Sequence, residues 1–259
     1  MTDDPRSQYR DPTRLNTRID LHARFSTNPQ GWHRWLFEQM ALVAGEAVLD
    51  VGCGNGVFWA SNAASLPRRL EVCLADLSPG MAAAASRRVS TLQVGAKFCT
   101  ANIEALPFKD ASFDAVLASH MMYHVDDVAR AFGEVKRVLR AGGRFFCSTN
   151  GLGHMRELGA FVKAANPKWP GFVYIERFGL ENARSFLAPH FASVELKRYS
   201  DSLEITDASA AVDYVLSMQT VSDPKGVIRR GVMDAVTREI RQKGSFHVSK
   251  ESGLFYCRR

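Results

Sequence analysis

The sequence predicts an α/β protein in which a doubly wound, mostly parallel sheet is covered by helices on both faces. Two observations favour this class. Short apolar runs alternate with helical patterns from residue 46 to residue 150, and the run FDAVLASH (113–120) is apolar almost throughout. Alternating strands and helices are typical of parallel sheets, and a continuous apolar strand indicates burial on both faces. A chain of 259 residues is long enough for one large domain of this kind.

The expected elements follow one another in a regular order. Residues 12–40 are expected to be helical and carry several aromatic side chains. Apolar runs then predict strands at 46–52, 70–77, 96–103, 113–120 and 143–149. Helical patterns lie between them at 57–66, 79–89 and 127–139. Ala141, Gly142 and Gly143 are expected to end the last of these helices.

Beyond residue 150 the alternation becomes irregular. Residues 151–178 combine glycine, proline and aromatic side chains. The elements expected after them are a helix at 180–188, a strand at 193–199, a helical stretch at 207–243 and a last strand formed by SGLFYCRR. No clean boundary for a second domain is visible, so residues 1–259 are expected to form a single domain.

The composition is that of an ordinary globular protein, with 46% apolar and 23% charged residues. No apolar run reaches the roughly 18 residues of a membrane span, and the polar N-terminus lacks the apolar region of a secretory signal. A cytoplasmic location and no membrane partner are therefore expected. The five cysteines are scattered without a C-x-x-C pair, so neither a disulfide framework nor a metal site is predicted.

The net charge of +6 is concentrated at the C-terminal end. Residues 225–259 contain nine Lys or Arg and three acidic residues, which accounts for the whole excess. A nucleic-acid surface is one interpretation. However, Ile228, Val232, Val236 and Ile240 repeat at every fourth position. This spacing favours a helix that buries an apolar stripe and turns its arginines outward.

The stretch VLDVGCGNG (48–56) is the most informative in the chain. It places Gly52, Gly54 and Gly56 between an expected strand and an expected helix. Glycine permits positive φ and allows a ligand to approach the bare backbone, and the start of a helix offers free N–H groups. The G-x-G-x-G spacing differs from the G-x-G-x-x-G of dinucleotide enzymes. The preceding acid, Asp50, makes the pattern more specific.

Polar residues end the next two strands. Asp76 follows Gly56 by twenty residues, and an acid at this place can accept hydrogen bonds from both hydroxyls of a ribose. Asn102 can face the edge of an adenine, and Ile103 can pack on its ring. In open α/β sheets, ligands bind at the carboxyl ends of the strands. A nucleoside-containing ligand is therefore predicted at this edge.

These segments resemble the class I S-adenosylmethionine (SAM)-dependent methyltransferases, and most closely their small-molecule members from quinone and natural-product pathways. The likeness covers about residues 46–150, with its parts in the order of the family: VLDVGCGNG, LADLSPGM, ANIEALPFKDASFDAV, ASHMMYHVDD and VLRAGGRF. It implies a Rossmann-like seven-stranded sheet with a helical cap, SAM as cofactor and S-adenosylhomocysteine as product. One departure is Asn102, where the family more often has aspartate; its carbonyl can still accept a hydrogen bond.

The resemblance also implies roles for individual residues. The glycine loop would wrap the methionine part, Asp50 would orient that loop directly or through water, and Asp76 would hold the ribose. In this family the N-terminal helix often closes over the cofactor, so Arg24 is a candidate partner for its carboxylate; a surface arginine is the alternative. The implied cofactor-binding residues are Asp50, Gly52, Cys53, Gly54, Asn55, Gly56, Asp76, Leu77, Met81, Asn102, Ile103, Glu104, Ala118, Ser119 and Arg24.

Three residues after the fourth strand are the catalytic candidates. Methyl transfer is an in-line displacement for which the protein supplies orientation and excludes water. A phenol or carbon acid also needs a base, and histidine has a suitable pKa. His120 is the first candidate, as a base or an acceptor-orienting group, with a place in the pocket wall as the alternative. His124 is interpreted as scaffold of the cofactor pocket, and Tyr123 either contacts substrate or packs in the core.

The expected function is transfer of a methyl group to O, N or C of a small secondary metabolite, by a monomer or homodimer. The expected organisation is a SAM-binding core at 41–150, a cap from 1–40, 151–178 and 207–243, and remaining core elements at 180–206 and 244–259. One alternative is a nucleic-acid methyltransferase, against which the lack of Asn-Pro-Pro-Tyr after the fourth strand counts. Others are a SAM-binding cyclase or lyase and a nicotinamide-dependent dehydrogenase, the last disfavoured by the glycine spacing.

Overall fold

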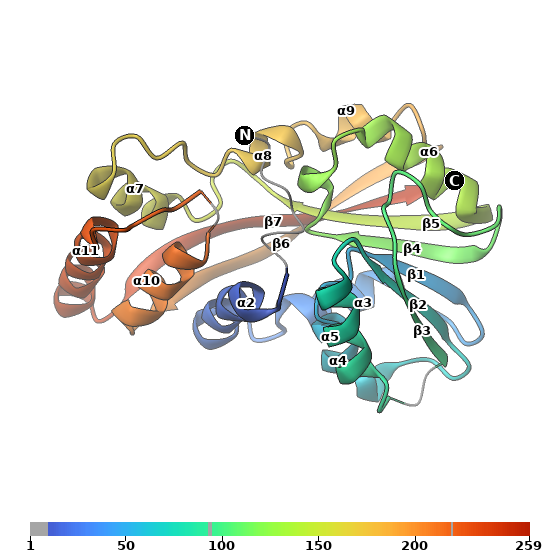
Figure 1. Cartoon of the computed structure of the whole chain (residues 1–259), viewed down its shortest axis with the longest axis horizontal. Coiled ribbons are helices and arrows are strands. Elements are labelled where there is room, and N and C mark those ends of the chain that lie inside the picture. The colour runs from blue at the N-terminus through green and yellow to red at the C-terminus, as the bar shows by residue number, and fades with distance from the viewer. Residues whose placement is uncertain (1–9, 93–94, 219) are drawn as a thin grey trace.

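A computed structural model describes residues 10–92, 95–218 and 220–259, and these form one seven-stranded sheet in the order β3-β2-β1-β4-β5-β7-β6 (Figure 1). The strands are β1 Ala47–Val51, β2 Glu71–Asp76, β3 Gly95–Thr100, β4 Phe113–Ser119, β5 Leu139–Asn150, β6 Ser193–Ile205 and β7 Phe246–Arg258. The first five strands are parallel to one another, and β7 runs antiparallel to both β5 and β6. The predicted α/β class is confirmed.

Helices cover both faces of the sheet, as Figure 1 shows. They are α2 Thr13–Phe25, α3 Trp32–Met40, α4 Val57–Ser61, α5 Pro79–Val89, α6 Val128–Val138, α7 Arg156–Ala165, α8 Tyr174–Arg177, α9 Ala183–Leu187, α10 Ala208–Ser217 and α11 Val227–Lys243. Two short 3₁₀ helices are η1 Ala63–Ser65 and η2 Met122–His124. Helices α3, α4 and α5 pack on one face, and α6 and α9 pack on the other.

The central strand β4 contributes to the hydrophobic cores on both sides of the sheet. Val116 packs in the core beneath α6, while Leu117 packs in the core beneath α3 and α4. Both side chains are fully buried. The nearly continuous apolar run in this part of the sequence is therefore explained by burial on both faces.

The β6–β7 hairpin extends beyond the rest of the sheet. Strand β5 pairs with residues 252–258 of β7, whereas residues 246–251 pair with residues 200–205 of β6. Helices α2, α7, α10 and α11 pack against this extension (Figure 1) and bury a third apolar core. Its members include Leu21, Val162, Val215, Val232 and Val248.

Both hairpin strands are longer than the sequence pattern predicts. The expected strands ended at residue 199 and began at Ser252, so the outer halves SDSLEI and FHVSKE were missed. These halves alternate apolar and polar side chains, because one face packs on helices and the other carries polar groups. A short alternating run with serine and charged residues is a weak strand signal.

Two predicted helix boundaries were also wrong. The helix before Gly142 ends at Val138, and Leu139 already pairs with Phe113 of β4, so strand pairing ends the helix before the glycines do. The helical stretch 207–243 consists of α10 and α11, separated by residues 218–226. Pro224 lies in that gap, where it interrupts the helical pattern.

Helix α11 has the amphipathic character predicted for the basic C-terminal region. Ile228 and Val232 are buried, whereas Arg229, Arg238 and Arg241 are exposed. Within residues 10–92, 95–218 and 220–259, no helix combines the length and apolar character needed to cross a membrane. The first nine residues of the expected cap lie outside the described residues.

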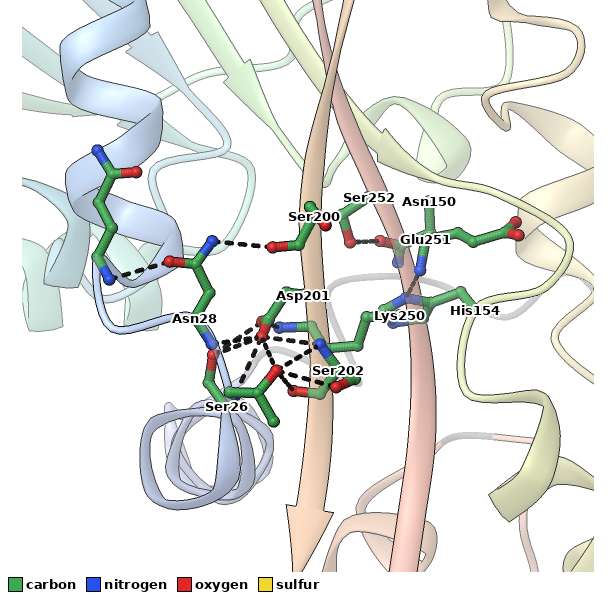
Figure 2. A network of polar contacts seen from close by, with 12 residues as sticks. Ser26, Asn28, Asn150, His154, Ser200, Asp201, Ser202, Lys250, Glu251 and Ser252 are labelled. Carbon is green, nitrogen blue, oxygen red and sulfur yellow. Dashed lines mark hydrogen bonds and ion pairs between the residues drawn. The ribbon is translucent and has the colours of Figure 1, made fainter.

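A buried ion pair joins the hairpin to the N-terminal helices. Asp201 on β6 lies opposite Lys250 on β7, and the two side chains form an ion pair (Figure 2). The Asp201 carboxylate also accepts hydrogen bonds from the Ser26 hydroxyl at 2.8 Å and the Asn28 backbone N–H at 3.0 Å. Burial by itself raises the pKa of Asp201, but the hydrogen bond and charge of Lys250 hold it below its usual range.

We expect Asp201→Ala to lower the free energy of unfolding by about 3–5 kcal/mol, because it leaves the Lys250 ammonium buried without a counter-charge. Denaturant unfolding at neutral pH measures this loss. Asp234→Ala on α11 removes an exposed aspartate and should change the value by less than about 0.5 kcal/mol. Equal effects of the two substitutions would contradict a structural role for the pair.

Candidate functional site

The glycine loop between β1 and α4 has the backbone conformation that its sequence predicts. Gly52 and Gly56 have φ angles of 75° and 73°, in the left-handed region that glycine favours. A Cβ on Gly52 would lie 2.7 Å from Cγ of Met121, and one on Gly56 would lie 2.9 Å from Cγ2 of Val89. The loop therefore requires glycine at both positions for its conformation and for its close packing.

The end of strand β2 holds this loop in place. The backbone N–H groups of Gly52 and Cys53 donate to the Ala75 carbonyl at 2.8 and 3.0 Å. The Gly54 N–H donates to one carboxylate oxygen of Asp76 at 2.9 Å, and the Ser78 N–H donates to the other at 2.8 Å. Burial raises the pKa of Asp76, and these two backbone bonds oppose the rise. The structure thus brings Asp76 and the glycine loop together.

Asp50 makes a contact that the sequence did not predict. Its side chain is buried, and one carboxylate oxygen accepts a hydrogen bond from the indole N–H of Trp59 at 2.7 Å. Asp50 therefore positions α4, and the expectation that it also orients the loop, directly or through water, stays a prediction. Trp59 was not singled out from the sequence, although an indole N–H near a buried acid is a natural donor. Burial raises the pKa of Asp50 from 3.8 to about 7, with the Trp59 bond opposing the rise and Asp76 adding to it.

The N-terminal helix α2 lies directly on the glycine loop. The Asn55 amide donates to the Asn16 side-chain oxygen at 2.6 Å, and the Asn55 oxygen accepts from the Val57 N–H at 3.1 Å. A Cβ on Gly54 would lie 3.1 Å from Leu15. Sequence reasoning assigned the helix to the cap but missed Asn16, since a lone polar residue on a helix gives no sign of its partner.

Arg24 is not placed at this loop by the structure. It lies eight residues beyond Asn16, which is about 12 Å along the helix. Its guanidinium forms ion pairs with Asp20 at 3.3 Å and with Asp207 at 2.7 Å. The expectation that Arg24 pairs with a cofactor carboxylate is therefore corrected, because the arginine joins α2 to the start of α10.

The residues expected around the adenine differ in their surroundings. Met81 and Ile103 are buried, Leu77 is half-buried, and Asn102 is exposed. The Asn102 side-chain oxygen accepts a hydrogen bond from the Glu104 N–H at 3.0 Å. This hydrogen bond fixes the orientation of the exposed Asn102 side chain.

Glu104 binds the neighbouring loop, which precedes α6. Its carboxylate accepts hydrogen bonds from the backbone N–H groups of Asp126 and Asp127 at 3.0 and 3.1 Å. These bonds hold the chain just before α6. The Glu104 carboxylate is therefore engaged in fixing this loop.

Strand β4 ends in a strained turn at His120. This residue has a φ of 52°, which is uncommon for a residue with a side chain. Its N–H donates to the carbonyl and hydroxyl oxygens of Ser148, both at 3.1 Å, and the Ser119 hydroxyl lies 3.0 Å from the same hydroxyl. Ala118 is fully buried within the strand. Strand β5 thus fixes the backbone that presents His120.

The environment of His120 keeps its imidazole neutral. Its ring lies 5.0 Å from the Trp32 ring. Burial lowers the pKa of His120 from 6.5 to about 4, and the charges of Lys250 and His33 add to this effect. A neutral imidazole at physiological pH can accept a hydrogen bond, but a pKa of about 4 makes His120 a weaker base than the ordinary histidine on which the expectation rests.

Tyr123 and His124 form a second aromatic group on η2. Their ring centroids are 4.7 Å apart, and Tyr123 lies at the same distance from Tyr174. Burial lowers the pKa of His124 to about 4, with contributions from Arg18 and Arg177. Met121, which packs over Gly52, lies between His120 and η2 in the chain. Met121 thus links the two groups to the glycine loop along the chain, and the roles assigned to His120, Tyr123 and His124 remain predictions.

The described residues contain no group of three or more His, Cys, Asp or Glu side chains arranged to hold a metal ion. The polar groups around the glycine loop instead hydrogen-bond to backbone N–H groups, as Asp76 does, or to other side chains, as Asp50 and Asn55 do. This arrangement suits an organic ligand with hydroxyl groups.

Comparisons with known proteins connect this geometry to a family. Residues 49–147 match the model of the family described as "Methyltransferase domain". Demethylmenaquinone methyltransferase from Symbiobacterium thermophilum is 36% identical over 124 residues, which are 45% of this chain and 47% of that protein. Malonyl-[acyl-carrier protein] O-methyltransferase from Hahella chejuensis is 39% identical over 102 residues, which are 39% of this chain and 36% of that protein. The chain thus matches less than half the length of these relatives.

Among solved structures, a SAM-dependent methyltransferase from Aquifex aeolicus shares the fold. Its TM-score is 0.57 at 14% sequence identity, with 96% of this chain and 98% of that chain covered. The two proteins therefore share the fold over nearly the whole chain, whereas the family match is confined to residues 49–147.

The raised pKa of Asp50 predicts a pH-dependent effect of Asp50→Asn. The folded protein binds the Asp50 proton more tightly than the unfolded chain, so the wild type loses stability as the pH rises from about 4 to about 7. Asparagine carries no such proton. The stability of the variant relative to wild type should therefore increase by about 1.4 kcal/mol per pH unit across this interval, as measured by urea unfolding at several pH values. A difference that is independent of pH would refute the assignment.

Proposed function

We propose that this chain, whose residues 49–147 match the family described as "Methyltransferase domain", is a class I methyltransferase that transfers a methyl group from SAM to a small molecule and releases S-adenosylhomocysteine. The observation that carries the proposal is the bond between the Asp76 carboxylate and the Gly54 N–H, beside three left-handed glycines. This hydrogen bond holds Asp76, which would bind the ribose hydroxyls, next to the glycine loop at the carboxyl ends of β1 and β2. Open α/β sheets bind their ligands at this position.

The residues present fit SAM. Each oxygen of the Asp76 carboxylate accepts one backbone N–H, and a carboxylate oxygen can accept a second hydrogen bond. Asp76 can therefore still receive the two ribose hydroxyls. The glycine loop would take the methionine part, and the exposed Asn102 would face the adenine. SAM supplies a methyl group activated by a positively charged sulfur.

The end of β4 is the acceptor side in this proposal. His120 would hold or receive the proton of the acceptor on its neutral imidazole, and Trp32, 5.0 Å away, would help exclude water. Ser148 supports this role by fixing the His120 backbone. Tyr123 and His124 would line the boundary between the acceptor and the glycine loop.

The proposal includes a single domain in which residues 10–40, 151–178 and 207–243 form the cap. The contacts of α2, α7, α10 and α11 in one apolar core support this organisation. The five cysteines are all unpaired, which suits the reducing cytoplasm. A small-molecule acceptor is supported by the relative whose name points to demethylmenaquinone, whereas the name of the other relative points to a malonyl group carried on a protein.

Calorimetric titration with SAM, and separately with NAD, tests the cofactor. Binding of SAM alone is expected, because the loop has the methyltransferase spacing. Incubation with SAM and a metabolite extract, followed by mass spectrometry, should then show S-adenosylhomocysteine together with a product heavier by one methyl group. A product formed without S-adenosylhomocysteine would favour a cyclase or lyase, and binding of NAD alone would overturn the proposal.

Asp76→Ala should weaken SAM binding by at least about 1.5–3 kcal/mol, the typical value for one hydrogen bond to a charged group. The affinity is measured by calorimetry on the purified variant. Asp213→Ala on α10 removes an exposed aspartate and serves as the control. An Asp76→Ala affinity equal to that of the control would show that the ribose lies elsewhere.

His120→Gln should separate binding from turnover. Glutamine keeps a hydrogen-bonding side chain but cannot take up a proton, so the rate of S-adenosylhomocysteine formation should fall by about 10²–10⁴-fold if the acceptor needs a base. The Kd for SAM should stay close to that of wild type. A large change in the Kd with an unchanged rate would identify His120 as a cofactor residue.

A further inference from the structure

A group of buried polar and aromatic side chains lies where α2, the end of β4 and the β6–β7 hairpin meet. We call its members, His22, His120, His154, Tyr199 and Lys250, the histidine cluster. His22 and His154 have ring centroids 6.2 Å apart, and the Lys250 ammonium lies 5.7 Å from the Tyr199 ring. Trp32 contacts the rings of both His120 and Tyr199, at 5.0 and 5.3 Å. Figure 2 shows two members of this group, His154 and Lys250, beside strand β7.

Two polar atoms of the cluster are buried without a hydrogen-bond partner among the described residues. They are Nδ1 of His22 and the hydroxyl oxygen of Tyr199. Tyr199 is only 3% exposed, and although Ser26 lies close to its hydroxyl, the two do not meet hydrogen-bond geometry. More than about 90% of buried polar groups in proteins are paired, and an unpaired one costs about 1–3 kcal/mol. Two such atoms in one cluster indicate a place where a ligand supplies the partners.

The cluster adjoins the site proposed for the methyl donor. His120 directly precedes Met121, whose side chain packs over Gly52 of the glycine loop. On α2, Asn16 bonds to Asn55 of that loop, and His22 lies six residues farther, about 9 Å along the helix axis. The same helix therefore borders both the donor loop and the cluster.

The charges of the cluster are already balanced. Asp201 neutralises Lys250 in a buried ion pair, and burial lowers the pKa values of His22, His120 and His154, so these rings are neutral at pH 7. A charged acceptor would be buried without a counter-ion, which is unfavourable. The rings of Trp32 and Tyr199 provide a surface that suits a flat apolar body.

We propose that the histidine cluster binds the methyl acceptor, and that this acceptor is an uncharged aromatic compound with a hydroxyl group that hydrogen-bonds to His22 and Tyr199. The inference rests on the proposed function, because it assigns the acceptor of that reaction. It adds an acceptor class and two binding residues, neither of which belongs to the glycine loop or to η2.

Binding of two probes to the protein saturated with S-adenosylhomocysteine tests the acceptor class. 2-Naphthol is flat, aromatic, hydroxylated and uncharged at pH 7, whereas 2-naphthoate has the same rings and carries a negative charge. Calorimetry should show that 2-naphthol binds at least about tenfold more tightly, which corresponds to about 1.4 kcal/mol. Equal or tighter binding of 2-naphthoate, or no binding of 2-naphthol, would overturn the inference.

Tyr199→Phe tests the binding residue with little disturbance of the fold, because it removes only a hydroxyl that has no partner. It should weaken 2-naphthol binding by about fivefold, the net value of one hydrogen bond, and leave the melting temperature unchanged or raised. Tyr256→Phe, a half-buried tyrosine on β7, is the matched control and should leave binding unchanged. Binding by Tyr199→Phe equal to that of the control would contradict the inference.

His22→Leu should have an effect on 2-naphthol binding similar to or larger than that of Tyr199→Phe, whereas His247→Leu removes an exposed histidine on β7 and should have none. An unchanged affinity in His22→Leu would contradict the role of His22. The Kd for SAM, measured on each variant, separates this inference from the proposed function. If SAM binds to wild type and 2-naphthol does not, only the inference fails; if SAM does not bind, the proposed function itself fails.

Discussion

The buried ion pair between Asp201 and Lys250 is the interaction on which the arrangement around the site depends. A carboxylate removed from water needs a counter-charge and several hydrogen-bond donors. Asp201 obtains the charge from the neighbouring strand and the donors from Ser26 and Asn28 just after α2. The chain is thereby fixed where α2 ends, and the helix runs from this point to the glycine loop, where Asn16 bonds to Asn55.

Burial also determines the protonation states around the site. The same loss of water that makes the ion pair necessary raises the pKa of Asp50 to about 7 and lowers the pKa of His120 to about 4. Each group shifts toward its neutral form because a charge is poorly solvated in the interior. The region beside the glycine loop is therefore rich in neutral hydrogen-bonding groups, and the buried Lys250 is paired with Asp201.

The glycine loop and the histidine cluster draw on different parts of the chain. The family match ends at residue 147, and it contains the glycine loop, Asp76 and His120. His22, Tyr199 and Lys250 lie outside it, on α2 and the extended hairpin. The hairpin and helices α2, α7, α10 and α11 form their own apolar core, so this part of the molecule packs around contacts that lie mostly outside the family match.

Local sequence determined the order of strands and helices up to residue 150, and it placed the left-handed glycines of VLDVGCGNG and the acid at the end of β2. These features depend on side-chain periodicity and on the backbone freedom of glycine, which act over a few residues. Only the tertiary structure decided that Asp50 bonds to Trp59, that Arg24 pairs with Asp207, and that Asp201 meets Lys250. The last pair is 49 residues apart and depends on the register of two long strands whose outer halves carry a weak apolar pattern. Such contacts are set by how distant elements pack, and no short stretch of sequence encodes that packing.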